Sequence, residues 1–240
     1  MAARQPRLYV LPASHYCERA RWALDLSGVA YSETCWAIGP HVPLARRLAP
    51  ATTLPILDTG REIIQGSGRI MDWTGLAGDD PDLERRFEDR IGVLVRQYLY
   101  SATLGESRSL ISALVRDGAP AWQAGAARAM WPVTRRAMIE RMNARPSMLT
   151  VLAVEIEAEL AWFEEQMDGR GYLRGNAIGR ADITAASLLA PLARPDACPL
   201  YRSIVLPAVV ETTLAIWSGQ PSIKWVLRLY ENERYRARRS

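Results

Sequence analysis

An α/β part followed by an all-helical part is the fold class that this sequence predicts. Up to Trp73, short apolar runs alternate with helical patterns and are bounded by turn residues. From Asp82 onward, apolar residues recur only at helical spacing. The stretch Gly75–Pro81 between the two parts is polar and rich in turn residues, which is typical of a linker. We therefore expect two domains, residues 1–76 and residues 82–240.

Four strand-like runs and three helical ones make up the first part. The expected strands are Leu8–Leu11, Tyr31–Trp36, Leu54–Leu57 and Glu62–Ile64, the last two joined as an antiparallel hairpin by the turn Asp58-Thr59-Gly60. The expected helices run from Ser14 to the stop signal Gly28, over Leu44–Leu48, and from Ser67 through Trp73. The order βαβαββα is the layout of a thioredoxin-like domain with a mixed sheet.

The second part is expected to be helical throughout. Helical periodicity covers Asp82–Thr103, Ala121–Met142, Met148–Met167, Ala181–Leu192, Ile204–Trp217 and Ile223–Tyr235. Most of its aromatic residues at helical spacing are expected in the core; they include Tyr98, Tyr100, Trp122 and Trp131.

Composition argues against several kinds of site. Cys17, Cys35 and Cys198 are far apart and odd in number, so we expect neither a disulfide framework nor a metal site. No apolar run reaches the roughly 18 residues of a membrane helix, and the polar, basic start lacks a signal-peptide core. The net charge of +4 comes from C-terminal arginines, which favour a solvated helix end over a nucleic-acid surface. We expect a soluble, cytoplasmic protein with no nucleic-acid or membrane partner.

Ser14 stands where the first strand gives way to the first helix, in the sequence Ser14-His15-Tyr16-Cys17. A helix N-terminus presents unpaired N–H groups and partial positive charge, both of which favour a thiolate. A serine hydroxyl there can donate a hydrogen bond to that thiolate. It can also simply cap the helix, and the two roles are compatible.

Two further motifs lie near later strands of the first part. In Thr53-Leu54-Pro55-Ile56, a proline at a strand start is unusual because it cannot donate to the ladder. In Gln65-Gly66-Ser67, the serine opens a helix. Ser67 is either a plain helix cap or a ligand-binding group.

Together these motifs resemble the serine-type glutathione transferases, which carry Ser-x-x-Cys and then an arginine, here Arg21, after the first strand. The resemblance implies that Ser14 activates the glutathione thiol. It also implies that Leu54, before a cis Pro55, pairs through its backbone with the cysteinyl part. Ser67 would bind the γ-glutamyl carboxylate, and His41 would approach the glycyl carboxylate or lie in a solvated loop.

The sequence departs from the family pattern at two of these positions. Gly66 stands where the family has an acidic residue, and Thr53 where many members have lysine or a polar equivalent. Either glutathione affinity is reduced, or Gln65 replaces the acidic group. A later segment, Gly179–Asp182, resembles the family's helical-domain capping box, which makes Asp182 structural.

The resemblance implies an enzyme. Glutathione is the expected co-substrate, no metal is involved, and a small hydrophobic electrophile is held by residues 82–170. Relatives of this kind are mostly C₂ homodimers, so we expect a homodimer. Two alternatives stay open: a non-catalytic binding or scaffold protein that keeps the fold, and a glutathione-dependent thiol-exchange enzyme that uses Cys17.

Overall fold

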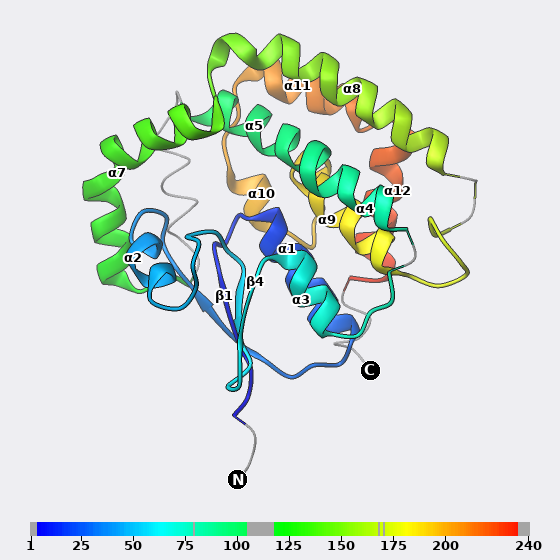
Figure 1. Cartoon of the computed structure of the whole chain (residues 1–240). Helices are drawn as coiled ribbons and strands as arrows, with labels where there is room; N and C mark the ends of the chain where they lie inside the picture. Colours follow the sequence, from blue (N-terminus) through cyan, green and yellow to red (C-terminus); the bar gives the residue numbers. More distant parts are fainter. Residues whose placement is uncertain (1–3, 79, 105–117, 168, 170, 235–240) are drawn as a thin grey trace. The chain divides into compact units, whose positions relative to one another are not determined.

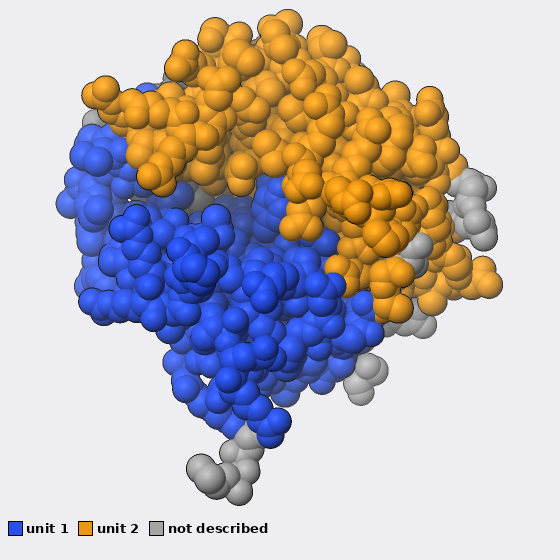
Figure 2. All heavy atoms as spheres, in the orientation of Figure 1, with its two compact units in different colours: residues 1–76, 111–135 blue, residues 77–110, 136–240 orange. Residues whose placement is uncertain are grey.

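The computed structural model describes residues 4–78, 80–104, 118–167, 169 and 171–234 (Figure 1). The chain divides into two compact units (Figure 2). The first contains residues 1–76 and 111–135, and the second contains residues 77–110 and 136–240. The first unit therefore includes a segment that follows part of the second along the chain.

The first unit contains a four-stranded mixed sheet. Its elements are β1 (Arg7–Val10), α1 (His15–Leu26), β2 (Ser32–Cys35), α2 (His41–Arg46), β3 (Ile56–Asp58), β4 (Ile63–Gln65) and α3 (Ser67–Trp73). The strand order is β2-β1-β3-β4. β1 is parallel to β2 and antiparallel to β3, and β4 is antiparallel to β3. This arrangement confirms the predicted thioredoxin-like order.

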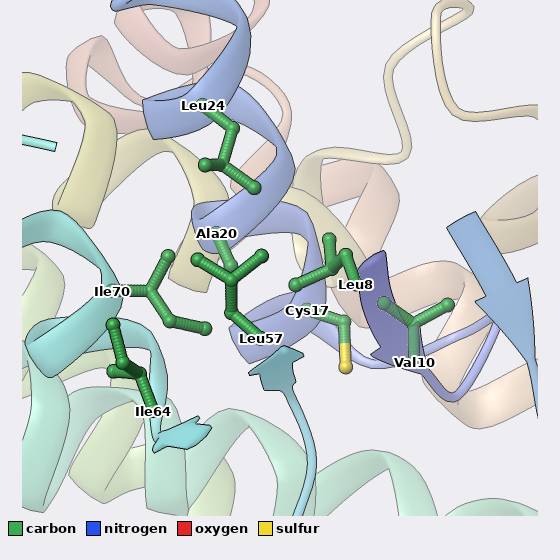
Figure 3. Packing of buried hydrophobic residues seen from close by; sticks show 8 residues of the cluster. All are labelled: Leu8, Val10, Cys17, Ala20, Leu24, Leu57, Ile64 and Ile70. Carbon is green, nitrogen blue, oxygen red and sulfur yellow. The ribbon is translucent and has the colours of Figure 1, made fainter. Parts of the chain in front are cut away.

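Helices cover both faces of this sheet. Alternate residues of β1 point to opposite faces because strand side chains alternate. Leu8 and Val10 join a cluster with α1 and α3 that contains Cys17, Ala20, Leu24, Leu57, Ile64 and Ile70 (Figure 3). Tyr9 lies on the other face, against Trp36 and α2, with its ring centroid 4.7 Å from that of Trp36. Tyr9 therefore faces away from α1.

Every regular element among the described residues of the second unit is a helix. It contains α4 (Pro81–Arg86), the π-helical turn η1 (Phe87–Ile91), α5 (Gly92–Thr103), the short 3₁₀ turn η2 (Pro146–Met148), α8 (Leu149–Gln166), α9 (Arg180–Ala193), α10 (Pro199–Ser203), α11 (Ala208–Trp217) and α12 (Pro221–Asn232). The remaining helix, α7 (Ala121–Met142), contributes its first part to the first unit. The all-helical prediction for this part of the chain is confirmed.

α9 is the central helix of the second unit, because every residue from Ala181 to Leu192 is buried. It packs against α4, α5 and α12. Asp182 fastens its start: one carboxylate oxygen accepts the Gly179 N–H (2.8 Å) and the other accepts the Leu173 N–H (2.8 Å). The predicted structural role of Asp182 is confirmed.

Two helices differ clearly in their bounds from the sequence prediction, and a third helix was not expected. α2 begins at His41 and ends at Arg46, not over residues 44–48. The helix expected from Ile204 begins only at Ala208, because Pro207 lacks an N–H and fits the start of a helix rather than its interior. α10 was not expected from the sequence. The last helix was expected to end at Tyr235, a residue that lies outside the described part of the chain.

In the part of the chain that the structure describes, no helix is both long and apolar enough to span a lipid bilayer.

Candidate functional site

Strand register brings three loops of the first unit to one end of the sheet. Tyr9 of β1 pairs with Ile56 of β3, and Ile56 pairs with Gln65 of β4. The segment after β1, the segment before β3 and the segment after β4 therefore lie at the same end. The Gly66 N–H donates to the Pro55 carbonyl at 3.0 Å, which joins two of these loops directly.

Ser14 caps α1 at this end of the sheet. Its backbone is extended, and its hydroxyl oxygen accepts the Cys17 N–H at 3.3 Å. The expected cap is therefore present. A serine hydroxyl has a proton to donate as well as lone pairs to accept with. The cap bond uses only the oxygen as acceptor, so Ser14 can still donate to a ligand atom.

Leu54 precedes Pro55 across a cis peptide bond, as predicted. The Leu54 side chain packs against both core clusters. The β3 ladder begins only at Ile56. Among the described residues, the Leu54 N–H and C=O make no backbone hydrogen bond. These two groups can therefore pair with an extended ligand, as a neighbouring strand would.

Ser67 is the first residue of α3 and is only 2% exposed. Its hydroxyl has no hydrogen-bond partner among the described residues. Leaving a buried polar group unsatisfied costs about 1–3 kcal/mol. The first amides of a helix also lack intrahelical partners. A carboxylate at this position could accept hydrogen bonds from the buried hydroxyl and from these amides.

The backbone explains why glycine occupies position 66. Gly66 has φ +98°, a conformation that L side chains rarely adopt. A Cβ at this position would meet no atom within 4 Å, so the constraint is conformational and not steric. An acidic residue would have room here but a strained backbone.

Gln65 holds the loop before Leu54 in place. Its side-chain NH₂ donates to the carbonyls of Ala51 and Thr53, at 2.8 Å each, and its amide oxygen accepts the Ala51 N–H at 3.2 Å. These bonds engage the same amide that would otherwise replace the missing acidic group. The Thr53 side chain is exposed, while its carbonyl is fixed by this clamp.

His41 begins α2, on the face of the sheet opposite α1. Its Nδ1 accepts the Gly39 N–H at 3.1 Å. This bond assigns the proton of the neutral ring to Nε2, which makes Nε2 a donor. Burial lowers the pKa of His41 to about 4, so the ring is neutral at pH 7.

Cys17 lies in the core between α1 and the sheet (Figure 3). Burial raises the pKa of its thiol, although Arg21 and Ser14 act in the opposite direction. The Arg21 guanidinium is paired with Glu33, with an Nε to Oε2 distance of 2.6 Å. A buried thiol with a raised pKa is a poor nucleophile. This environment disfavours Cys17 as the working group of a thiol-exchange reaction.

Sequence reasoning missed one contact of the first unit. Gln123 of α7 is buried, and its amide oxygen accepts the Ala37 N–H at 3.0 Å. No local pattern marks it, because the partners are 86 residues apart. Of the aromatic residues expected in the core, Tyr98 and Trp131 are buried, whereas Trp122 is 63% exposed.

Comparisons with known proteins give one matching family model for the first part of the chain. Residues 8–78 match the family model described as "Glutathione S-transferase, N-terminal domain". None of the curated proteins matches the sequence.

Several solved structures are similar over nearly the whole chain. FzlA from C. crescentus is 18% identical over 95% of this chain and 98% of its own, with a TM-score of 0.55. A glutathione S-transferase from Methylobacterium radiotolerans, in complex with glutathione sulfonate, is 18% identical over 92% and 94%, with a TM-score of 0.52. Glutaredoxin 2 from Salmonella typhimurium, in complex with glutathione, is 15% identical over 94% and 98%, with a TM-score of 0.54. At such identities these likenesses establish a shared fold.

Proposed function

We propose, from the premise that residues 8–78 match the N-terminal domain of the glutathione S-transferase family, that this protein is a glutathione transferase. The observation that carries the proposal is the buried hydroxyl of Ser67, which has no partner among the described residues. It lies at the sheet end that also holds Ser14 and the Leu54 backbone, which makes no backbone hydrogen bond within the described part of the chain. The γ-glutamyl carboxylate would accept from Ser67, and the cysteinyl backbone would pair with Leu54. Thr53 and Gly66 flank these two contacts.

The sulfur of a glutathione bound in this way would lie near the start of α1. The Ser14 hydroxyl would donate to the sulfur, and the positive end of the helix would add to the stabilisation of the thiolate. The thiol proton leaves to solvent. The thiolate then forms a carbon–sulfur bond with a small hydrophobic electrophile, whose leaving group takes the displaced electron pair. The electrophile would be held by the helical part, and the protein would act in the cytoplasm as a homodimer.

The second candidate is a non-catalytic protein that uses the same fold for binding. Gly66 has no side chain to pair with the γ-glutamyl amine, and the exposed Thr53 offers no positive charge. These two residues favour weaker glutathione binding than an acidic residue and a lysine would give. The thiol-exchange alternative ranks last, because Cys17 is buried and its pKa is raised.

Calorimetric titration of the full-length protein with glutathione tests the proposal. Ser67→Ala should weaken binding about 10- to 150-fold, since a hydrogen bond to a charged group is worth about 1.5–3 kcal/mol. Ser101→Ala is the matched control: this serine of α5 is also buried and its hydroxyl also lacks a partner among the described residues. The control should bind like the parent protein. A parent that binds no glutathione, or a Ser67→Ala variant that binds as tightly as the parent, would refute the proposed site.

A further inference from the structure

Helix α7 lies along the segment between β2 and α2, at residues 36–40 (Figure 1). Gln123 accepts the Ala37 N–H near the start of the helix. About three turns later, the Thr134 hydroxyl lies so close to Gly39 that an added Cβ would be 3.0 Å from it. Both contacts fall inside the first unit. The first part of α7 therefore packs against the segment that leads into α2. This helix lies outside the matched family domain of residues 8–78.

Trp131 belongs to the same face of α7 as these two contacts. It follows Gln123 by eight residues and precedes Thr134 by three, spacings that keep residues on one side of a helix. The side chain is 7% exposed. Its indole N–H has no hydrogen-bond partner among the described residues. Tryptophan can only donate, so this buried N–H needs an acceptor that the described residues do not supply.

The surroundings favour an acceptor with negative charge. Neither residues 36–57 nor residues 121–135 contain an aspartate or a glutamate. Together the two segments carry Arg46, Arg47, Arg128 and Arg135. Glu33, on the neighbouring β2, is held by Arg21. His41, at the start of α2, lies beside the same segment, where its Nδ1 accepts the Gly39 N–H.

We propose that the indole N–H of Trp131 donates a hydrogen bond to the glycyl carboxylate of bound glutathione, so that α7 supplies one side of the site. This inference rests on the proposed function. It adds a ligand contact from a helix outside the thioredoxin-like segment. His41 and Trp131 would then hold the glycyl end from two elements, while Ser67 holds the γ-glutamyl end.

The test compares Trp131→Phe with Trp122→Phe in titrations with glutathione and with γ-glutamylcysteine, which lacks the glycyl group. Phenylalanine keeps an aromatic ring and removes the N–H. Trp131→Phe should bind glutathione about 10- to 150-fold more weakly than the parent and bind γ-glutamylcysteine as the parent does. Trp122 is on the same helix but exposed, so Trp122→Phe should change neither affinity.

Two results would overturn the inference. Unchanged glutathione affinity would show that the indole N–H makes no contact with the ligand, and an equal loss for both ligands would show that Trp131 acts through the fold. A second measurement does not depend on a variant's folding. In the ¹⁵N-labelled parent, the Trp131 indole N–H resonance should shift with glutathione but not with γ-glutamylcysteine, and no shift with either overturns the inference.

These outcomes also separate the two proposals. If the parent binds glutathione and Ser67→Ala weakens that binding, while Trp131→Phe has no effect, the proposed function stands and the role of Trp131 falls. If the parent binds neither ligand, both fall together.

Discussion

Ser14 has two hydrogen-bonding roles that draw on different parts of its hydroxyl. The oxygen accepts the Cys17 N–H and caps α1, while the proton can be donated elsewhere. The cap bond stabilises the fold, whereas the donated bond would stabilise the thiolate of glutathione. A substitution removes both, so the two roles must be measured separately.

Ser14→Ala should reduce turnover of a small aromatic halide with glutathione far more than it weakens glutathione binding. The bond to sulfur is strongest in the ionised state, so its loss falls on thiol activation. We expect a rate loss of about 10- to 150-fold at neutral pH. The deficit should shrink as pH rises past about 8.5, where a free thiol ionises unaided. Steady-state kinetics as a function of pH measure this.

The same variant should lose about 1 kcal/mol of unfolding free energy through the missing cap. A Ser14→Ala protein with lowered stability and parental turnover would assign Ser14 to capping alone. Absence of turnover in the parent with any thiol-reactive electrophile would favour the binding-protein candidate.

His41 should make stability depend on pH. Burial lowers its pKa to about 4, whereas an unfolded histidine titrates near 6.5. Below pH 6.5 the unfolded chain binds a proton that the folded protein does not, so stability falls as pH falls. At pH 5 the contribution lost relative to pH 7 should be about 2 kcal/mol. Urea unfolding of the parent and of His41→Asn at both pH values measures it. Parallel pH dependence in the two proteins would show that His41 is solvated in the folded state.

At the scale of single elements, α7 is joined to the sheet domain by a polar contact. The Gln123 amide oxygen accepts a buried backbone N–H from Ala37, next to the start of α2. The contact holds the segment that carries His41. The contact stabilises the fold because it gives the Ala37 N–H an acceptor, and a buried N–H without an acceptor costs free energy.

Gln123→Ala should destabilise the protein by about 1–3 kcal/mol, because the Ala37 N–H loses its acceptor away from water. Arg128→Ala, at an exposed position of the same helix, should stay within about 0.5 kcal/mol of the parent. Denaturant unfolding followed by circular dichroism gives both values. Equal stability of the two variants would mean that water reaches the Ala37 amide.

At the scale of the whole molecule, the resemblance predicts a C₂ homodimer in which the N-terminal domain of one subunit meets the helices of the other. Light scattering after size-exclusion chromatography should give twice the mass of the chain and a fall toward the monomer on dilution. A monomeric mass at every concentration would contradict the prediction.

Features carried by neighbouring residues could be predicted from the sequence alone. The order of strands and helices, the Ser14 cap, the hairpin turn and the Asp182 cap follow from spacing and turn chemistry over a few positions. The orientation of Tyr9, opposite to that of Leu8 and Val10, agrees with the alternation of side chains along a strand. Boundaries near prolines, such as the late start of α11, were less accurate.

What the sequence by itself determined is thus the thioredoxin-like order, the helical second part and the positions at which a ligand could be held. Only the tertiary structure decided that the Ser67 hydroxyl is buried with no partner among the residues that the structure describes. It also decided that Gln65 is engaged with the Ala51–Thr53 loop and that α7 lies against residues 37–39. The physical reason is that burial and hydrogen bonding depend on atoms from segments far apart in the chain. Local patterns specify an element, whereas its partners are chosen by how the elements pack.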